Sequence, residues 1–128
     1  MQSVTSNGVA NALGYLVWET TDPQEIGENV TFNFDRPIPN GFTRIRVETG
    51  NVLPSMDYVF YTECLIGKKI YLSLHFTSAQ GVEYAPNRII DNITTTSFRV
   101  GICRFYKSDV GFSNATDRII PLRIWAIK

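Results

Sequence analysis

Apolar and polar residues alternate with a period of two along most of this chain, from residue 15 to its end. In residues 70–77, for example, every even-numbered residue is large and apolar, whereas Tyr71, Ser73 and His75 occupy the positions between them. Successive side chains of a strand point to opposite faces, so this pattern indicates a strand with one buried face. The same reasoning predicts strands at residues 15–20, 30–34, 42–47, 58–65, 70–77, 97–105 and 119–127, with short or irregular strands at 82–87 and 89–93.

Glycine- and proline-rich segments separate these strands and predict turns between them. Residues 106–118 are expected to form a long polar loop, and Phe98, Val100, Ile102 and Arg104 are expected to share one strand face. No long helical pattern lies between the strands, which argues against a parallel α/β sheet. The prediction is an all-β fold, an antiparallel sandwich or barrel.

The chain ends on a dense apolar segment whose last residues include Trp125 and Ile127. Chain ends usually fray unless they are held in place. A terminus this apolar is therefore expected to be a paired, buried strand in the centre of the fold, with Trp125 packed rather than exposed.

The only helical pattern lies at residues 3–14, where Val9, Ala12 and Leu13 form one narrow apolar stripe and Gly14 can end the helix. Two helical turns are not stable alone in water. The stripe must therefore pack against the body of the domain or against the same helix of sister chains. This divides the chain into a short helix, 1–14, and a β domain, 15–128.

The composition suits one globular domain of 128 residues, with 44% hydrophobic and 19% charged residues. Twelve Lys and Arg balance twelve Asp and Glu, so the net charge is zero. A nucleic-acid binder usually carries a basic excess, and attraction to an anionic membrane also needs one, so neither partner is predicted. No apolar run approaches the ~20 residues of a transmembrane helix.

Catalytic and metal-binding motifs are sparse. Hydrolases of the Ser-His-Asp or Cys-His kind need a histidine, and this chain has one, His75, in mid-strand. No zinc, phosphate-binding or nucleophile-elbow motif occurs, and no cofactor or metal is predicted. A carboxylate pair for glycan cleavage stays open, because its members could come from distant strands. Cys64 and Cys103 are expected to be buried thiols, with a disulfide or a metal site as alternatives.

Two segments predicted to lie at loops combine an aromatic ring with hydrogen-bonding groups, a mixture that suits sugar binding. An aromatic face covers the C–H side of a sugar ring, and planar amide, carboxylate or guanidinium groups bind its hydroxyls. The alternative is that the tyrosines are half-buried at loop bases. The candidate ligand-binding residues are Tyr84, Asn87, Arg88, Tyr106 and Asp109.

The segment VTSNGVANAL, residues 4–13, resembles the VTSNAVANAL-type segment of bacteriophage tail-fibre and receptor-binding proteins, with Gly8 in place of Ala. The rest of the chain resembles the tip domains that such segments introduce. The matching stretches are Phe32 and Phe34 followed by RPIP at 36–39, NITTTSFRV at 92–100, and LRIWAI at 122–127. The chain ends on Lys128, where that family usually has a glycine.

The same pattern is shared more loosely with H-type lectins, trimeric antiparallel sandwiches that bind N-acetylgalactosamine-like sugars. The resemblance implies an H-type-lectin-like β-sandwich at the distal end of a tail fibre in the virion. It implies a homotrimer, with Val9, Ala12 and Leu13 along the axis, that binds a host cell-surface carbohydrate without catalysis. The resemblance transfers no individual sugar-binding residue. A structural module that contacts other tail proteins is the alternative, and a glycan-degrading enzyme is a third.

Overall fold

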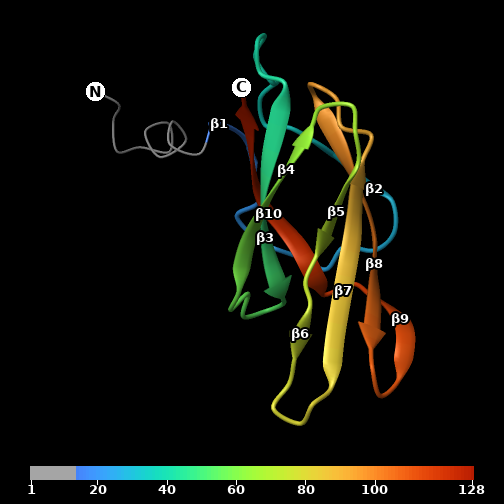
Figure 1. Cartoon of the computed structure of the whole chain (residues 1–128). Helices are drawn as coiled ribbons and strands as arrows, with labels where there is room; N and C mark the ends of the chain where they lie inside the picture. The colour runs from blue at the N-terminus through green and yellow to red at the C-terminus, as the bar shows by residue number, and fades with distance from the viewer. Residues whose placement is uncertain (1–13) are drawn as a thin grey trace.

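The computed structural model describes residues 14–128, which form two antiparallel β-sheets and contain no helix (Figure 1). A four-stranded sheet has the order β1-β10-β3-β4, and a six-stranded sheet has the order β2-β8-β7-β5, with β6 paired to β7 and β9 paired to β8. The strands of the first sheet are β1 (Tyr15–Glu19), β3 (Arg44–Val52), β4 (Val59–Leu65) and β10 (Arg118–Ile127). Those of the second are β2 (Val30–Asn33), β5 (Ile70–Ser73), β6 (Phe76–Thr77), β7 (Glu83–Asp91), β8 (Ser97–Lys107) and β9 (Gly111–Ala115).

The expectation of an all-β fold with antiparallel sheets is therefore confirmed. The predicted helix, with its stripe of Val9, Ala12 and Leu13, lies outside the described residues, and the structure does not test it.

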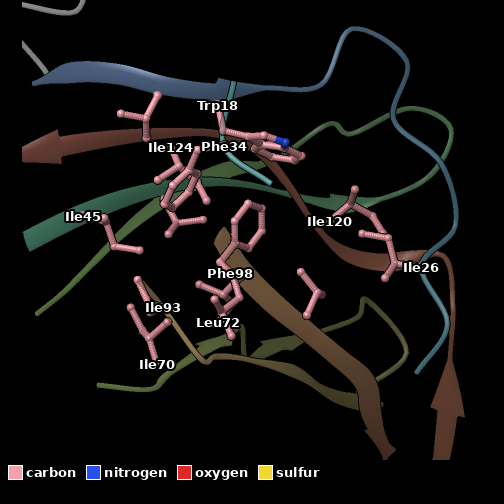
Figure 2. Close-up of a cluster of buried hydrophobic side chains, with 14 of the residues drawn as sticks. Trp18, Ile26, Phe34, Ile45, Ile70, Leu72, Ile93, Phe98, Ile120 and Ile124 are labelled. Carbon is pink, nitrogen blue, oxygen red and sulfur yellow. The ribbon is translucent and has the colours of Figure 1, made fainter. Parts of the chain in front are cut away.

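The two sheets pack face to face around a single apolar core, as in a sandwich. Alternate residues of each sheet supply it: Val47 and Ile124 from the four-stranded sheet, and Leu72, Ile90 and Phe98 from the six-stranded sheet, all fully buried. Figure 2 shows inward side chains of both sheets, among them Ile124, Leu72 and Phe98, meeting between the layers, with Phe98 in the middle. The alternation read from the sequence is thus the pattern that builds the core.

Phe98 is the centre of an aromatic cluster. Its ring centroid lies 5.0 Å from that of Trp18, 5.4 Å from that of Phe32 and 5.3 Å from that of Phe34. The contact with Trp18 is edge-on and the other two are stacked, and both geometries are favourable for aromatic pairs. Two segments distant in sequence from Phe98 therefore converge on its ring.

The final strand lies inside its sheet, between β1 and β3, as its apolar sequence predicts. Ile124 and Ala126 face the core, so Trp125 points to the opposite side of the sheet. Trp125 is only 3% exposed and its ring centroid lies 6.2 Å from that of Tyr61. The expectation that Trp125 is packed is confirmed.

Strand β8 departs from the predicted alternation at a bulge. Arg88 of β7 pairs with Cys103 of β8, but Ile90 pairs with Val100, so two β8 residues bulge opposite Ile89. Gly101 belongs to this bulge, and a Cβ atom there would lie 2.5 Å from the Ile89 side chain. The bulge exchanges the two faces of β8 beyond it, so that Cys103 is buried.

The prediction that Ile102 and Arg104 share a face with Phe98 and Val100 is therefore wrong. Arg104 is exposed on the outer side of the sheet, and Cys103 takes the core position.

Other element boundaries differ from the sequence prediction as well. The strand predicted at residues 70–77 is interrupted, because β5 ends at Ser73 and β6 begins at Phe76. Three other segments are more regular than predicted. The predicted loop at 106–118 contains β9, which pairs with β8 from Gly111 to Ala115. Residues 83–91 form one continuous strand rather than two short ones. Strand β3 runs on to Val52, through the glycine at 50 that indicated a turn. In each of these three segments, pairing with a neighbouring strand outweighs the weak local preference of the sequence for a turn or loop.

Both cysteines are free thiols, Cys103 fully buried and Cys64 partly buried, as the sequence predicts. Burial raises the pKa of each thiol above its ordinary value. The two thiols thus contribute to the packing of the sheets as small apolar groups.

Candidate functional site

The five residues that the sequence suggested as ligand-binding do not share one face, because successive side chains of a strand point to opposite sides of the sheet. Tyr84 and Arg88 of β7 point to the inner side of the six-stranded sheet, as Ile90 does. Asn87 of β7 and Tyr106 of β8 point to the outer side. The structure thus brings two of the five onto a common surface.

Asp109 lies in the turn between β8 and β9, where its carboxylate is 3.8 Å from the ammonium group of Lys107. It is exposed at the tip of this hairpin. Asp109 therefore belongs to neither face of the sheet.

Arg88 is fully buried and is not available to a ligand at the surface, which corrects the prediction for this residue. Its Nε donates a hydrogen bond to the carbonyl oxygen of Ile119 at 2.9 Å, and Nη1 donates to that of Gly101 at 2.6 Å. Further bonds reach the carbonyl oxygens of residues 26, 27, 116 and 118. Burial lowers the pKa of Arg88, and the negative charge of nearby Asp117 partly opposes this shift. Arg88 therefore joins β10, the β8 bulge and the loop before β2.

Tyr84 is held in an aromatic stack that faces inward. Its ring centroid lies 4.9 Å from that of Phe76 on β6 and 5.9 Å from that of Phe105 on β8, and the Lys107 ammonium group lies 5.6 Å from the Tyr84 ring. A ring covered in this way stabilises the far end of the sheet. The alternative reading of a half-buried tyrosine fits this residue.

The outer side of the six-stranded sheet carries two adjacent cross-strand rows. In one, Ser73, Asn87, Arg104 and Asn114 lie opposite one another on β5, β7, β8 and β9. Directly opposed residues of antiparallel strands present their side chains on the same face, close together. The next row places Tyr106 beside Phe112. We call these six residues, Ser73, Asn87, Arg104, Asn114, Tyr106 and Phe112, the outer-face patch.

The patch combines an aromatic surface with polar groups that have no partners. The ring centroids of Tyr106 and Phe112 are 4.9 Å apart, and Phe112 is 73% exposed. Within residues 14–128, no hydrogen bond or ion pair occupies the side chains of Asn87, Arg104 or Asn114. These amide and guanidinium groups are therefore free to bind a ligand.

On the outer side of the four-stranded sheet, by contrast, the charged side chains are paired with one another. The Arg123 Nε lies 2.6 Å from a Glu19 oxygen, and its Nη1 binds Glu48. The Tyr61 hydroxyl donates to Glu48 at 2.8 Å, and this bond and burial raise the pKa of Tyr61. On the same face Arg44 and Arg46 both pair with Glu63. Of the two outer surfaces, the six-stranded one offers more unoccupied donors and acceptors.

A hollow of about 740 Å³ lies at the other end of this same outer face. Thr31 of β2, Asp91 at the end of β7 and Ser97 at the start of β8 line it, together with the turn that carries Lys68 and Lys69. Asp91 and Asn87 are four residues apart on β7, so about 13 Å of strand separates the hollow from the outer-face patch. Tyr71, 57% exposed, lies between them on β5.

The patch presents the kinds of group that saccharide binding uses. Aromatic rings cover the C–H faces of sugars, and amide and guanidinium groups form planar, directional hydrogen bonds with hydroxyl groups. Four patch residues, Ser73, Arg104, Phe112 and Asn114, were missed from the sequence. Ser73 was placed on the face opposite the core but was not proposed as ligand-binding. Arg104 was assigned to the wrong face because the bulge has no sequence pattern, and Phe112 and Asn114 fell in a predicted loop. The Phe112-Ser113-Asn114 alternation was the available signal.

Within the described residues, no group of His, Cys, Asp and Glu side chains could hold a metal ion. Residues 14–128 also include no helix long and apolar enough to cross a membrane. No protein-family model, curated protein or solved structure matches the chain.

Proposed function

We propose that this protein is the tip of a bacteriophage tail fibre, where a homotrimer binds a bacterial surface glycan without catalysis. The observation that carries the proposal is the outer-face patch, in which the exposed ring of Phe112 and the half-buried ring of Tyr106 adjoin unpartnered amide and guanidinium groups. The tail-fibre context is supported by the resemblance of residues 4–13 to the segments that introduce such tips. The protein would be made in the host cytoplasm and act outside the cell, on the virion.

The finer fold assignment belongs to the same proposal. An H-type-lectin-like sandwich is compatible with two antiparallel sheets packed around one core. The non-catalytic assignment rests on the single histidine of the chain and its lack of hydrolase motifs. Release of reducing ends from a bacterial polysaccharide would contradict it and favour a glycan-degrading enzyme.

Replacing Phe112 with alanine is expected to weaken glycan binding at least about tenfold, because loss of an aromatic contact removes about 0.5–1.5 kcal/mol in addition to its buried area. Arg104→Ala is expected to weaken binding similarly, since hydrogen bonds that involve a charged group are worth about 1.5–3 kcal/mol. The measurement is binding of the purified protein to a panel of bacterial surface glycans.

Val110→Ala is the matched control for this experiment, because Val110 lies in the adjacent turn and is 75% exposed, nearly as much as Phe112. It is expected to bind as the unmodified protein does. Absence of binding to every glycan on a broad panel would contradict the proposed function. Equal binding by Phe112→Ala, Arg104→Ala and the control would contradict the assignment of the patch.

The alternative, a structural module that contacts other tail proteins, is favoured by the edge strand β4. Tyr58, Val59, Tyr61 and Leu65 are between 39% and 54% exposed along this edge. Exposed apolar edge strands readily pair with another chain. Adsorption to host cells that is unchanged by substitutions in the patch, together with binding to tail components, would favour this alternative.

The homotrimer has a separate test in light scattering of the whole chain. We expect the mass of three chains. The helix predicted at residues 3–14 is too short to be stable without partners, and linking three weak sugar sites increases the avidity of binding. A monomer mass for the chain that includes residues 1–13 would contradict trimerisation through Val9, Ala12 and Leu13.

A further inference from the structure

Hydrogen bonds join the walls of the hollow on the outer face. One wall is the turn between β4 and β5, and the other is the loop between β7 and β8. The backbone N–H of Gly67 donates to the carbonyl oxygen of Ile93 at 3.0 Å, which joins the two walls. The Thr94 hydroxyl accepts hydrogen bonds from the N–H groups of Thr96 and Ser97, at 3.1 and 3.0 Å. These hydrogen bonds hold the two walls of the hollow to each other and fix the Thr94 turn.

The only acidic side chain among the lining residues is already paired. The Asp91 carboxylate accepts two hydrogen bonds from the Arg99 guanidinium, both at 2.8 Å. These bonds hold the pKa of Asp91 below its ordinary value, and the charge of Lys69 lowers it further. Asp91 is thus ionised, and a bidentate partner neutralises its charge.

The two lysines of the hollow have no such partner. Across the described part of the chain, no hydrogen bond or ion pair occupies the ammonium group of Lys68 or Lys69. The charges of Asp91 and Arg99 cancel, so the two lysines leave two positive charges beside the hollow. Thr31 and Ser97 line the hollow with hydroxyl groups. Lysine ammonium groups and hydroxyls are common ligands of carboxylate and phosphate oxygens.

We infer that the hollow binds an anionic group of the glycan, a carboxylate or a phosphate, through Lys68 and Lys69. The inference rests on the proposed function and assigns it an acidic class of saccharide. One end of the outer face would hold the charged substituent, and the outer-face patch would hold neutral sugar rings about 13 Å or more away along the strands. Tyr71, exposed between the two, lies on the path of the connecting chain.

An NMR titration that observes each backbone amide tests this inference. The probes are glucuronate, inorganic phosphate and glucose, the neutral counterpart of glucuronate. We expect glucuronate or phosphate to shift the amide resonances of Gly67 and Thr94, and glucose to leave them in place. Raising the ionic strength from about 0.01 M to about 0.15 M shortens the Debye length from about 30 Å to about 8 Å and is expected to weaken these shifts.

The variant is Lys68→Gln/Lys69→Gln, which keeps two long polar side chains and removes both charges. It is expected to fold as the unmodified protein does, because both positions are exposed, and to lose the shifts at Gly67 and Thr94. Lys107→Gln is the matched control, since Lys107 lies at the other end of the sheet, on the inner side. It is expected to retain them.

Shifts with phosphate alone would identify a phosphate-bearing glycan, and shifts with glucuronate alone would identify a uronic acid. Equal shifts with glucose and glucuronate, shifts that survive in the double variant, or no shift at Gly67 and Thr94 with either anion would each overturn the inference. Failure of the proposed function would show separately, as a lack of shifts at Phe112 and Asn114 with every saccharide tested.

Discussion

Replacing Arg88 with methionine is expected to lower the free energy of unfolding by more than about 3 kcal/mol, a large part of the total stability of a small domain. Methionine replaces the apolar stem of the arginine side chain and cannot donate a hydrogen bond. The carbonyl oxygens of Gly101, Ile119 and four other residues would then lose a donor inside the protein. Each buried acceptor without a partner costs about 1–3 kcal/mol. The measurement is unfolding in urea.

Arg104→Met is the matched control, because Arg104 lies one strand away on the exposed side of the same sheet. Its unfolding free energy is expected to change by about 0.5 kcal/mol or less. Arg88→Lys keeps the charge with fewer donors, so its stability is expected to fall between those of Arg88→Met and the unmodified protein. Equal unfolding midpoints for Arg88→Met and Arg104→Met would contradict the structural role of Arg88.

Phe98→Ala is expected to cost about 3–5 kcal/mol of stability, the usual range for deleting a fully buried phenylalanine. Its ring contacts Trp18, Phe32 and Phe34, which come from β1, from β2 and from the segment after β2. A rigid interior would not close over the resulting cavity completely, so the loss includes a cavity term in addition to lost burial. Thermal and urea unfolding both report it.

Phe112→Ala completes the comparison, since it removes the same side chain from a position that is 73% exposed. It is expected to leave stability nearly unchanged and to weaken glycan binding, whereas Phe98→Ala is expected to reduce stability. A stability loss for Phe112→Ala as large as that of Phe98→Ala would show that the patch is part of the core.

Much of the fold could be read from the sequence because the core depends on a local pattern. Alternation located nearly every strand of the two sheets, and the apolar ending of the chain placed β10 in the interior. Strand β9 was missed because Phe112 is its only large apolar residue. Strand β9 is held mainly by pairing with β8, and such a strand is hard to recognise from its amino-acid composition.

The candidate site was harder to predict, because it depends on contacts between distant segments. Arginine is rarely buried, and Arg88 is buried here only because carbonyl oxygens from β10, the β8 bulge and two loops converge on it. Nothing in the residues around position 88 shows that convergence. Asn87 and Tyr106 could be proposed from their chemistry, but their common face follows from the register of β7 and β8.

The bulge at Gly101 depends on the number of residues in β8. That number, rather than the identity of any side chain, determines which residues of β8 lie on the outer face of the sheet. Removing one residue there would return β8 to plain alternation, which would turn Arg104 and Tyr106 inward and bring Cys103 and Phe105 to the surface. A one-residue deletion would thus change several side chains of the outer-face patch at once, whereas a substitution changes one. In related chains, a length change at this point would therefore alter the outer face of the six-stranded sheet more than a single substitution on it would.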